Sequence, residues 1–137
     1  MEALTGGCLC GGVCYEITEP LVSASYCHCT RCQRRTGTAA AATARTAPGS
    51  FRIVQGEELL KAWTPDDGFA KVFCSNCGSA LYSQDPADPD NTIGVRMGTF
   101  DSDPGIRPQY RHHTATAAVW EPLPDDGLPG YPDTPED

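Results

Sequence analysis

The sequence predicts a mainly β fold of short strands within a single domain. Many short segments alternate apolar with polar side chains, which is typical of half-buried strands. Twelve prolines and fourteen glycines are spread along the 137 residues, and they favour frequent turns over long helices. This length suits one compact domain, and no break in composition marks a linker between two domains.

Each candidate strand shows alternation or a run of β-favouring side chains between turn residues. Val13, Tyr15 and Ile17 alternate with polar neighbours in the first segment. Four consecutive alanines normally favour helix, but flanking threonines lead us to interpret residues 38–44 as a strand. The candidates are VCYEIT (13–18), LVSASYCHC (21–29), TAAAATA (38–44), FRIVQG (51–56), ELLKAW (58–63), FAKVFC (69–74), SALYSQ (79–84) and TIGVRMGTF (92–100).

Turn residues connect four of these segments into two expected strand pairs. FRIVQG pairs with ELLKAW, and FAKVFC pairs with SALYSQ. The segment TRCQRRTG (30–37) indicates a tight turn that can hold one helical turn. We expect residues 1–120 to form the domain and residues 121–137 to form an acidic, proline-rich tail, which belongs to that domain or is partly disordered.

The formal net charge of −8 is concentrated near the C-terminus. Residues 121–137 carry six acidic and no basic side chains, which leaves 12 acids against 10 bases in the rest of the chain. This nearly balanced body has no extended basic face, and it therefore argues against nucleic-acid binding.

The sequence also predicts a cytoplasmic protein with no membrane span. It contains no run of 18 or more apolar residues, and MEALTGGCLCGG lacks the pattern of a secretory signal. We expect the eight cysteines to stay reduced in that compartment. Clustered reduced cysteines indicate metal ligation or redox chemistry rather than disulfide bonds.

Seven cysteines fall into three groups, and two pairings of these groups would satisfy a four-sulfur zinc site. In one pairing, the CxC of GGCLCGG joins the CxxC of FCSNCG and leaves a CxCxxC group for a second site. In the other, two CxxC groups combine as in zinc ribbons, which leaves GGCLCGG without a role. We favour the first. The groups are Cys8 and Cys10; Cys27, Cys29 and Cys32; and Cys74 and Cys77.

Three thiolates at Cys27, Cys29 and Cys32 would leave zinc one position for water or a ligand, as in catalytic zinc sites. A thiol bound there would lose its proton at neutral pH and remain nucleophilic, so the expected reaction is addition to an electrophilic carbon, such as an aldehyde carbonyl. The alternative is a closed site with a fourth protein ligand. The candidates by residue type are Cys14, His28, His112 and His113, the last two being interpreted as a surface pair.

Arginines accompany the CxCxxC group. Arg34 and Arg35 are candidate substrate-binding residues, because guanidinium groups pair with carboxylates in two-point contacts. Together with Arg31 they are equally explained as solvated cations that offset the charge of the thiolates.

Three motifs in this order resemble the family of glutathione-dependent formaldehyde-activating (GFA) enzymes, whose domain also occurs in centromere protein V. They are GGCLCGGVCYEI, CHCTRCQRRTG and FCSNCGSALYS, and the closing PQYRHHTATAAVWEPLPDDGLPGYPDTP is similar as well. The resemblance spans about residues 4 to 135. The chain departs from the family pattern at Cys14 and at Val119, where a proline commonly precedes the tryptophan.

The resemblance implies small packed antiparallel sheets around two zinc ions, similar to Rab-interacting zinc proteins. It implies a carbon-sulfur lyase that reversibly adds glutathione, or a similar small thiol, to formaldehyde or another small aldehyde. The alternative hypotheses are a non-catalytic, zinc-stabilised protein-interaction module and a protein that handles metal or redox chemistry. The implied ligands are Cys8, Cys10, Cys74 and Cys77 for a structural zinc, and Cys27, Cys29 and Cys32 for a catalytic zinc.

Overall fold

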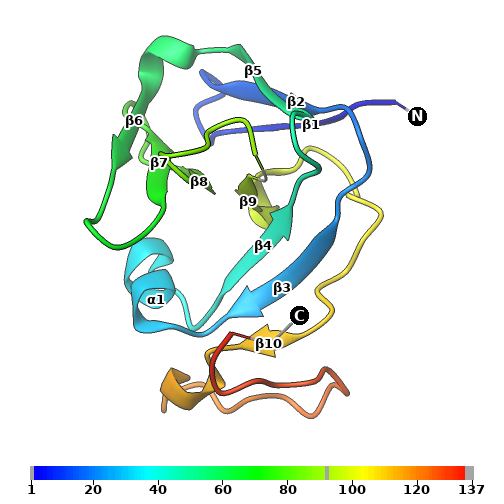
Figure 1. Ribbon diagram of the computed structural model, residues 1–137, viewed down its shortest axis with the longest axis vertical. Helices are drawn as coiled ribbons and strands as arrows, with labels where there is room; N and C mark the ends of the chain where they lie inside the picture. The colour runs from blue at the N-terminus through cyan, green and yellow to red at the C-terminus, as the bar shows by residue number, and fades with distance from the viewer. Residues whose placement is uncertain (1, 92, 135–137) are drawn as a thin grey trace.

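Two β-sheets build the protein, and the computed structural model describes them over residues 2–91 and 93–134 (Figure 1). Strand order is β1-β2-β5 in the smaller sheet and β10-β3-β4-β9-β8-β7-β6 in the larger one. The predicted mainly β class is confirmed. The strands are β1 (Leu4–Gly7), β2 (Cys14–Ile17), β3 (Ser23–Cys27), β4 (Ala41–Arg45), β5 (Phe51–Gln55), β6 (Leu60–Trp63), β7 (Ala70–Cys74), β8 (Ala80–Gln84), β9 (Gly94–Arg96) and β10 (Arg111–His112).

The core lies between the two sheets and is built from alternating residues. Val13, Tyr15 and Ile17 are fully buried, as their spacing predicted. The Phe51 ring connects the sheets, because its centroid lies 5.2 Å from that of Tyr15 and 4.8 Å from that of Tyr82. Aromatic contacts of this kind stabilise the fold beyond the area they bury.

Strand β1 approaches the Tyr15 ring too closely for a side chain at Gly6. A Cβ atom there would overlap the Tyr15 hydroxyl and the Thr99 carbonyl oxygen. The hydroxyl itself forms a 2.6 Å hydrogen bond with Thr99 Oγ1, which satisfies the one polar group of a fully buried ring. Glycine is therefore required at this position by packing rather than by backbone conformation.

One predicted strand pair is wrong, because β5 and β6 belong to different sheets. Strand β5 pairs with β2, whereas β6 pairs with β7. The chain crosses between the sheets at Gly56, whose φ of 82° favours glycine, and through a 3-10 turn, η1 (Glu57–Leu59). Phe51 and Ile53 explain why β5 pairs with β2, because in this position both side chains pack on the apolar core. The β7–β8 pair and the alanine-rich strand β4 are confirmed.

The CxCxxC group continues into a helix rather than a strand. Strand β3 ends at Cys27, and α1 (Thr30–Thr36) follows it. Cys29 caps this helix, and its Sγ accepts a 3.2 Å hydrogen bond from the Cys32 backbone N–H. Gly37 closes the helix with φ 69° and donates its N–H to the Gln33 carbonyl at 2.8 Å. The helix thereby positions two of the three cysteines.

The last candidate strand shortens to β9, and a 3-10 turn, η2 (Met97–Thr99), follows it. Thr92, at the start of that predicted segment, lies outside the described residues. The chain then reaches β10 and a third 3-10 turn, η3 (Thr114–Thr116). None of the described helices is long and apolar enough to cross a membrane.

The described part of the C-terminal tail runs back along β10 (Figure 1). The Arg111 N–H donates to the Pro129 carbonyl, and the Tyr131 N–H donates to the Arg111 carbonyl, both at 2.9 Å. The Arg111 guanidinium packs over Tyr26 and pairs with Asp126 at 2.7 Å. Backbone and side-chain contacts thus hold residues 126–133 against the edge of the larger sheet.

The Gly6→Ala substitution should lower the free energy of unfolding by about 1–3 kcal/mol, because the added methyl group has no space beside Tyr15. Gly98→Ala is the matched control, since a Cβ atom there meets nothing within 4 Å. Chemical denaturation of both variants measures the difference. Equal stabilities for the two variants would contradict the packing assigned to Gly6.

Candidate functional site

Four cysteine sulfurs meet where the N-terminal loop contacts the β7–β8 turn. The four Sγ atoms all lie within 4.8 Å of one another, with Cys8 and Cys10 at 3.5 Å and Cys10 and Cys74 at 3.9 Å. Two glycine turns shape the cluster: Gly11 donates to the Cys8 carbonyl at 3.1 Å and Gly78 to the Cys74 carbonyl at 2.8 Å. Both glycines have φ near 78°. The donor set fits tetrahedral zinc.

Hydrogen-bond donors lie beside this cluster, and at Cys77 they favour the thiolate form. The Val13 N–H donates to Cys8 Sγ at 3.2 Å. The Ser79 hydroxyl, 3.2 Å from Cys77 Sγ, is the largest of the contacts that lower the pKa of Cys77 to about 5. Metal ligation requires deprotonated cysteine, so these contacts prepare the cluster to hold a cation.

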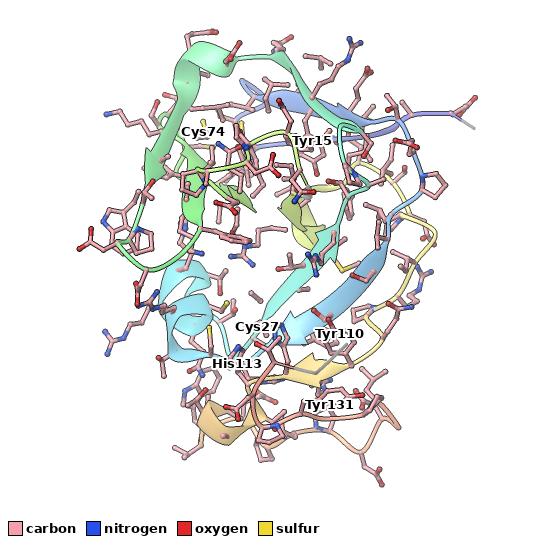
Figure 2. All side chains as sticks on the ribbon, in the orientation of Figure 1. Tyr15, Cys27, Cys74, Tyr110, His113 and Tyr131 are labelled. Atoms are coloured by element: carbon pink, nitrogen blue, oxygen red, sulfur yellow. The ribbon has the colours of Figure 1, made fainter. Side chains whose placement is uncertain are left out.

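Three further sulfurs gather at the junction of β3 and α1. The Sγ atoms of Cys27, Cys29 and Cys32 all lie within 4.8 Å of one another. Figure 2 shows Cys27 well away from Cys74 of the four-sulfur cluster. The structure therefore brings Cys8 and Cys10, and not Cys29 and Cys32, to Cys74 and Cys77. Three sulfurs fit a zinc site with one position left for another ligand.

The cysteines of the three-sulfur cluster differ in pKa. A hydrogen bond from the Cys27 thiol is the largest of the effects that lower the pKa of Cys32 to about 5, and Arg96 and Lys71 contribute to it. The same hydrogen bond, together with burial, raises the pKa of Cys27. Cys32 is consequently a thiolate at neutral pH, in a position where a cation is electrostatically favoured.

A pocket of about 430 Å³ opens beside this cluster, on one face of the larger sheet. Alternate residues of adjacent strands form its floor, which explains why positions far apart in the sequence meet there. No acidic residue lines it within the part of the chain that the structure describes. The lining residues are Ser25, Cys27, Cys32, Thr43, Arg45, Phe69, Lys71, Ser83, Gly94, Arg96, Tyr110, His112 and Thr134.

Three cations give the pocket its charge. Arg45, Lys71 and Arg96 reach it from β4, β7 and β9. Among the described residues, no carboxylate forms an ion pair with any of them, and Arg96 instead donates a hydrogen bond to Thr43 Oγ1. Burial is the largest of the effects that lower the pKa of Lys71, and the positive charge of Arg96 adds to it. The pocket is therefore suited to an anionic ligand.

The arginines that follow the cysteines in sequence lie elsewhere. Arg31 pairs with Asp67 at 2.9 Å, on the surface. Arg34 lines a separate hollow beside Trp120. Arg35 lies over the Phe73 ring, 5.4 Å from its centroid, and lines a neighbouring hollow that also contains Arg96. Neither Arg34 nor Arg35 lines the pocket at Cys27.

The sequence did not predict Arg45, Lys71 or Arg96 as site residues. Alternation did place Arg96 on the polar face of its segment, opposite Ile93 and Val95. No local pattern indicated that this face would meet the CxCxxC group. That information comes from the strand order β3-β4-β9-β8-β7.

The four candidates for the fourth ligand lie in different parts of the fold. Cys14 lies in the smaller sheet, and its Sγ contacts the Gly11 carbonyl at 3.7 Å. His28 is buried with its Nε2 3.2 Å from an Arg111 guanidinium nitrogen. His112 and His113, by contrast, each place a ring nitrogen within 4.8 Å of Cys27 Sγ. The histidine pair interpreted as a surface feature is thus part of the site.

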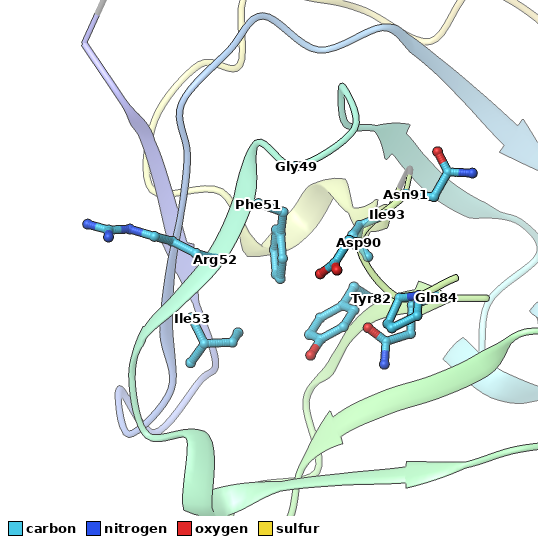
Figure 3. A pocket seen from close by; sticks show the side chains of 10 residues that line it. Gly49, Phe51, Arg52, Ile53, Tyr82, Gln84, Asp90, Asn91 and Ile93 are labelled. Atoms are coloured by element: carbon cyan, nitrogen blue, oxygen red, sulfur yellow. The ribbon is translucent and has the colours of Figure 1, made fainter. Parts of the chain in front are cut away.

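A second hollow of about 300 Å³ lies between the two sheets (Figure 3). Phe51 and Tyr82 line it together with Asp90 and Gln84. It contains no thiol and no imidazole, so it offers none of the chemistry of the cysteine clusters.

Comparisons with known proteins identify the family and a similar fold. The sequence profile described as "Glutathione-dependent formaldehyde-activating enzyme" matches residues 3–116. A protein of Halomonas elongata, named "Putative glutathione-dependent formaldehyde-activating enzyme", is 29% identical over 115 residues, which are 80% of this chain and 73% of that protein. A crystal structure of a Rhodobacter sphaeroides protein is similar with a TM-score of 0.60 and 26% identity, covering 93% of this chain and 98% of that one.

Replacing a sulfur of the four-sulfur cluster should destabilise the fold far more than replacing the isolated thiol. With zinc present, we expect Cys77→Ser to cost more than about 3 kcal/mol of unfolding free energy, because a cluster that joins two distant segments loses a ligand. Cys14→Ser, outside both clusters, should cost less than about 1 kcal/mol. Chemical denaturation and metal analysis compare the two variants. Equal losses would argue against a structural metal at this cluster.

Proposed function

Because the chain belongs to the glutathione-dependent formaldehyde-activating enzyme family, we propose that it is a zinc-dependent carbon-sulfur lyase of the cytoplasm. The reaction is the reversible addition of glutathione, or a similar small thiol, to formaldehyde. One observation carries this proposal: a three-sulfur cluster forms part of the wall of a pocket lined by three cations that lack carboxylate partners among the described residues.

Two zinc ions have different roles in this proposal. Cys8, Cys10, Cys74 and Cys77 hold one that connects the N-terminal loop to the β7–β8 turn. Cys27, Cys29 and Cys32 hold the other. Zinc at the second site would act as a Lewis acid, which favours the thiolate form of a small thiol at neutral pH.

The pocket residues position the thiol and receive its charge. Arg45, Lys71 and Arg96 pair with its carboxylates, since charge-assisted hydrogen bonds to carboxylates are the strongest available in such a site. A longer thiol that extends past Arg96 reaches Arg35 in the neighbouring hollow. Arg34, beside Trp120, receives no contact in this arrangement.

The chemistry needs little beyond this placement. The thiol sulfur forms a bond to the carbonyl carbon, the carbon-oxygen π bond breaks, and the oxygen takes up a proton to give the hydroxymethyl product. The proton lost from the thiol balances the one gained by the oxygen. Holding both reactants together in the pocket removes much of the entropic cost of their encounter.

Exchange between formaldehyde, glutathione and their adduct should be faster with the protein than without it. Exchange NMR at equilibrium measures this rate, with a protein-free sample as the control for the spontaneous reaction. Cys32→Ser should return the rate to the spontaneous value, because it removes a sulfur from the three-sulfur cluster. Cys14→Ser should leave it unchanged. A wild-type rate equal to the spontaneous one would favour the non-catalytic interaction module.

Lys71→Met should weaken the binding of glutathione by about 10- to 100-fold, since it removes one charge-assisted contact. The loss should appear in KM rather than kcat if the contact is equally strong in the ground and transition states. Lys61→Met is the matched control, because Lys61 is exposed on β6 and does not line the pocket. 2-Mercaptoethanol, which has no carboxylate, should distinguish the variants much less than glutathione does. An unchanged KM for glutathione would contradict the proposed role of Lys71.

A further inference from the structure

His112 lies beside the three-sulfur cluster because of the strand that carries it. Strand β10 pairs with β3 in parallel register, which places His112 directly beside Cys27. The His28 N–H donates to the His112 carbonyl at 3.0 Å and continues this pairing beyond Cys27. Side chains in register on neighbouring strands point to the same face of a sheet. His112 therefore shares the face of the pocket and of Cys27.

The imidazole of His112 has unused bonding capacity at this position. One of its ring nitrogens lies within 4.8 Å of Cys27 Sγ, and its Nδ1 is buried without a hydrogen-bond partner among the described residues. Buried polar atoms are rarely left unsatisfied. Neutral imidazole is a common ligand of zinc alongside thiolates. The ring thus has both the chemistry and the location of a ligand.

Each of the other two histidines already has a hydrogen-bonding contact at one ring nitrogen. The His28 ring nitrogen contacts Arg111. His113 begins the turn η3 with φ 56°, and its Nε2 forms a 3.1 Å hydrogen bond with Thr134 Oγ1. His112 has ring contacts only of the edge or tilted kind, with Tyr110 and His113, and such contacts leave its nitrogens available.

We propose that His112 is a fourth protein ligand of the metal centre at Cys27, Cys29 and Cys32, and that an incoming thiol displaces it. This inference rests on the proposed function for the presence of the metal. The donor atom of His112 groups with Cys27 rather than with all three sulfurs, so a rotation of the ring must bring it toward Cys29 and Cys32. The adjoining pocket, which the ring lines, provides the space for this rotation.

Displacement of His112 by a thiolate changes the charge of the metal centre, and the cations of the pocket compensate for this change. Replacing a neutral imidazole by a thiolate adds one negative charge to the centre. Lys71 and Arg96 line the same pocket as Cys27 and Cys32. The cations that receive the carboxylates of the thiol therefore also offset the charge gained when its sulfur replaces His112. A site closed by His112 exchanges its fourth ligand only for a ligand that the cations favour.

Long-range proton–nitrogen NMR of the zinc-loaded full chain with isotope-labelled histidine tests this assignment. The chain has three histidines, and one imidazole should show the nitrogen shift of a metal-bound ring. His112→Gln should remove that signal, and the matched variant His113→Gln should retain it. Glutathione should convert the bound ring into a free one. His112→Gln should also weaken the binding of one of the two zinc ions by about 10-fold or more.

The number of zinc ions per chain distinguishes a failure of the His112 assignment from a failure of the proposed function. Two zinc ions per chain together with three free imidazoles would overturn the role of His112 and leave the proposed function standing. One zinc ion per chain would overturn both, because the three-sulfur cluster would then hold no metal. The wild-type spectrum alone decides between these results if His112→Gln fails to fold.

Discussion

Crowding of cysteine sulfurs is the constraint on which the rest of this structure depends. Seven sulfurs lie in two clusters, each with its members within 4.8 Å of one another. Thiolates at such distances repel unless positive charge or hydrogen-bond donors compensate them. The surrounding structure supplies both: backbone N–H groups and Ser79 at one cluster, and the helix α1, Arg96 and Lys71 at the other.

The two clusters differ in what the fold places next to them. The four-sulfur cluster lies between two glycine turns. The three-sulfur cluster lies at the edge of a sheet face from which cations and a histidine project. A small protein can therefore use the same ligand chemistry once for stability and once at a site open to a substrate.

Residues next to the three-sulfur cluster contribute to its geometry. The alanines of β4 leave space beside Cys27, because Ala41 is its partner in the register between β3 and β4. The tail that returns along β10 holds Arg111 in place through Pro129 and Tyr131. This support fixes the strand that carries His112, so a terminal segment contributes to the geometry of the site.

Sequence patterns determined the features that depend on neighbouring residues. Alternation identified β2 and the β7–β8 pair, and cysteine spacing favoured a four-sulfur and a three-sulfur cluster over a ribbon-type pairing of the two CxxC groups. Tertiary structure decided the remainder: the partner of β5, the cysteine groups that meet, and the cations that face the sulfurs. Arg34 and Arg35 follow the cysteines in sequence, but they lie on helix α1 and do not line the pocket. Arg45, Lys71 and Arg96 line it instead. Strand order brings these distant positions together, and no local pattern encodes strand order.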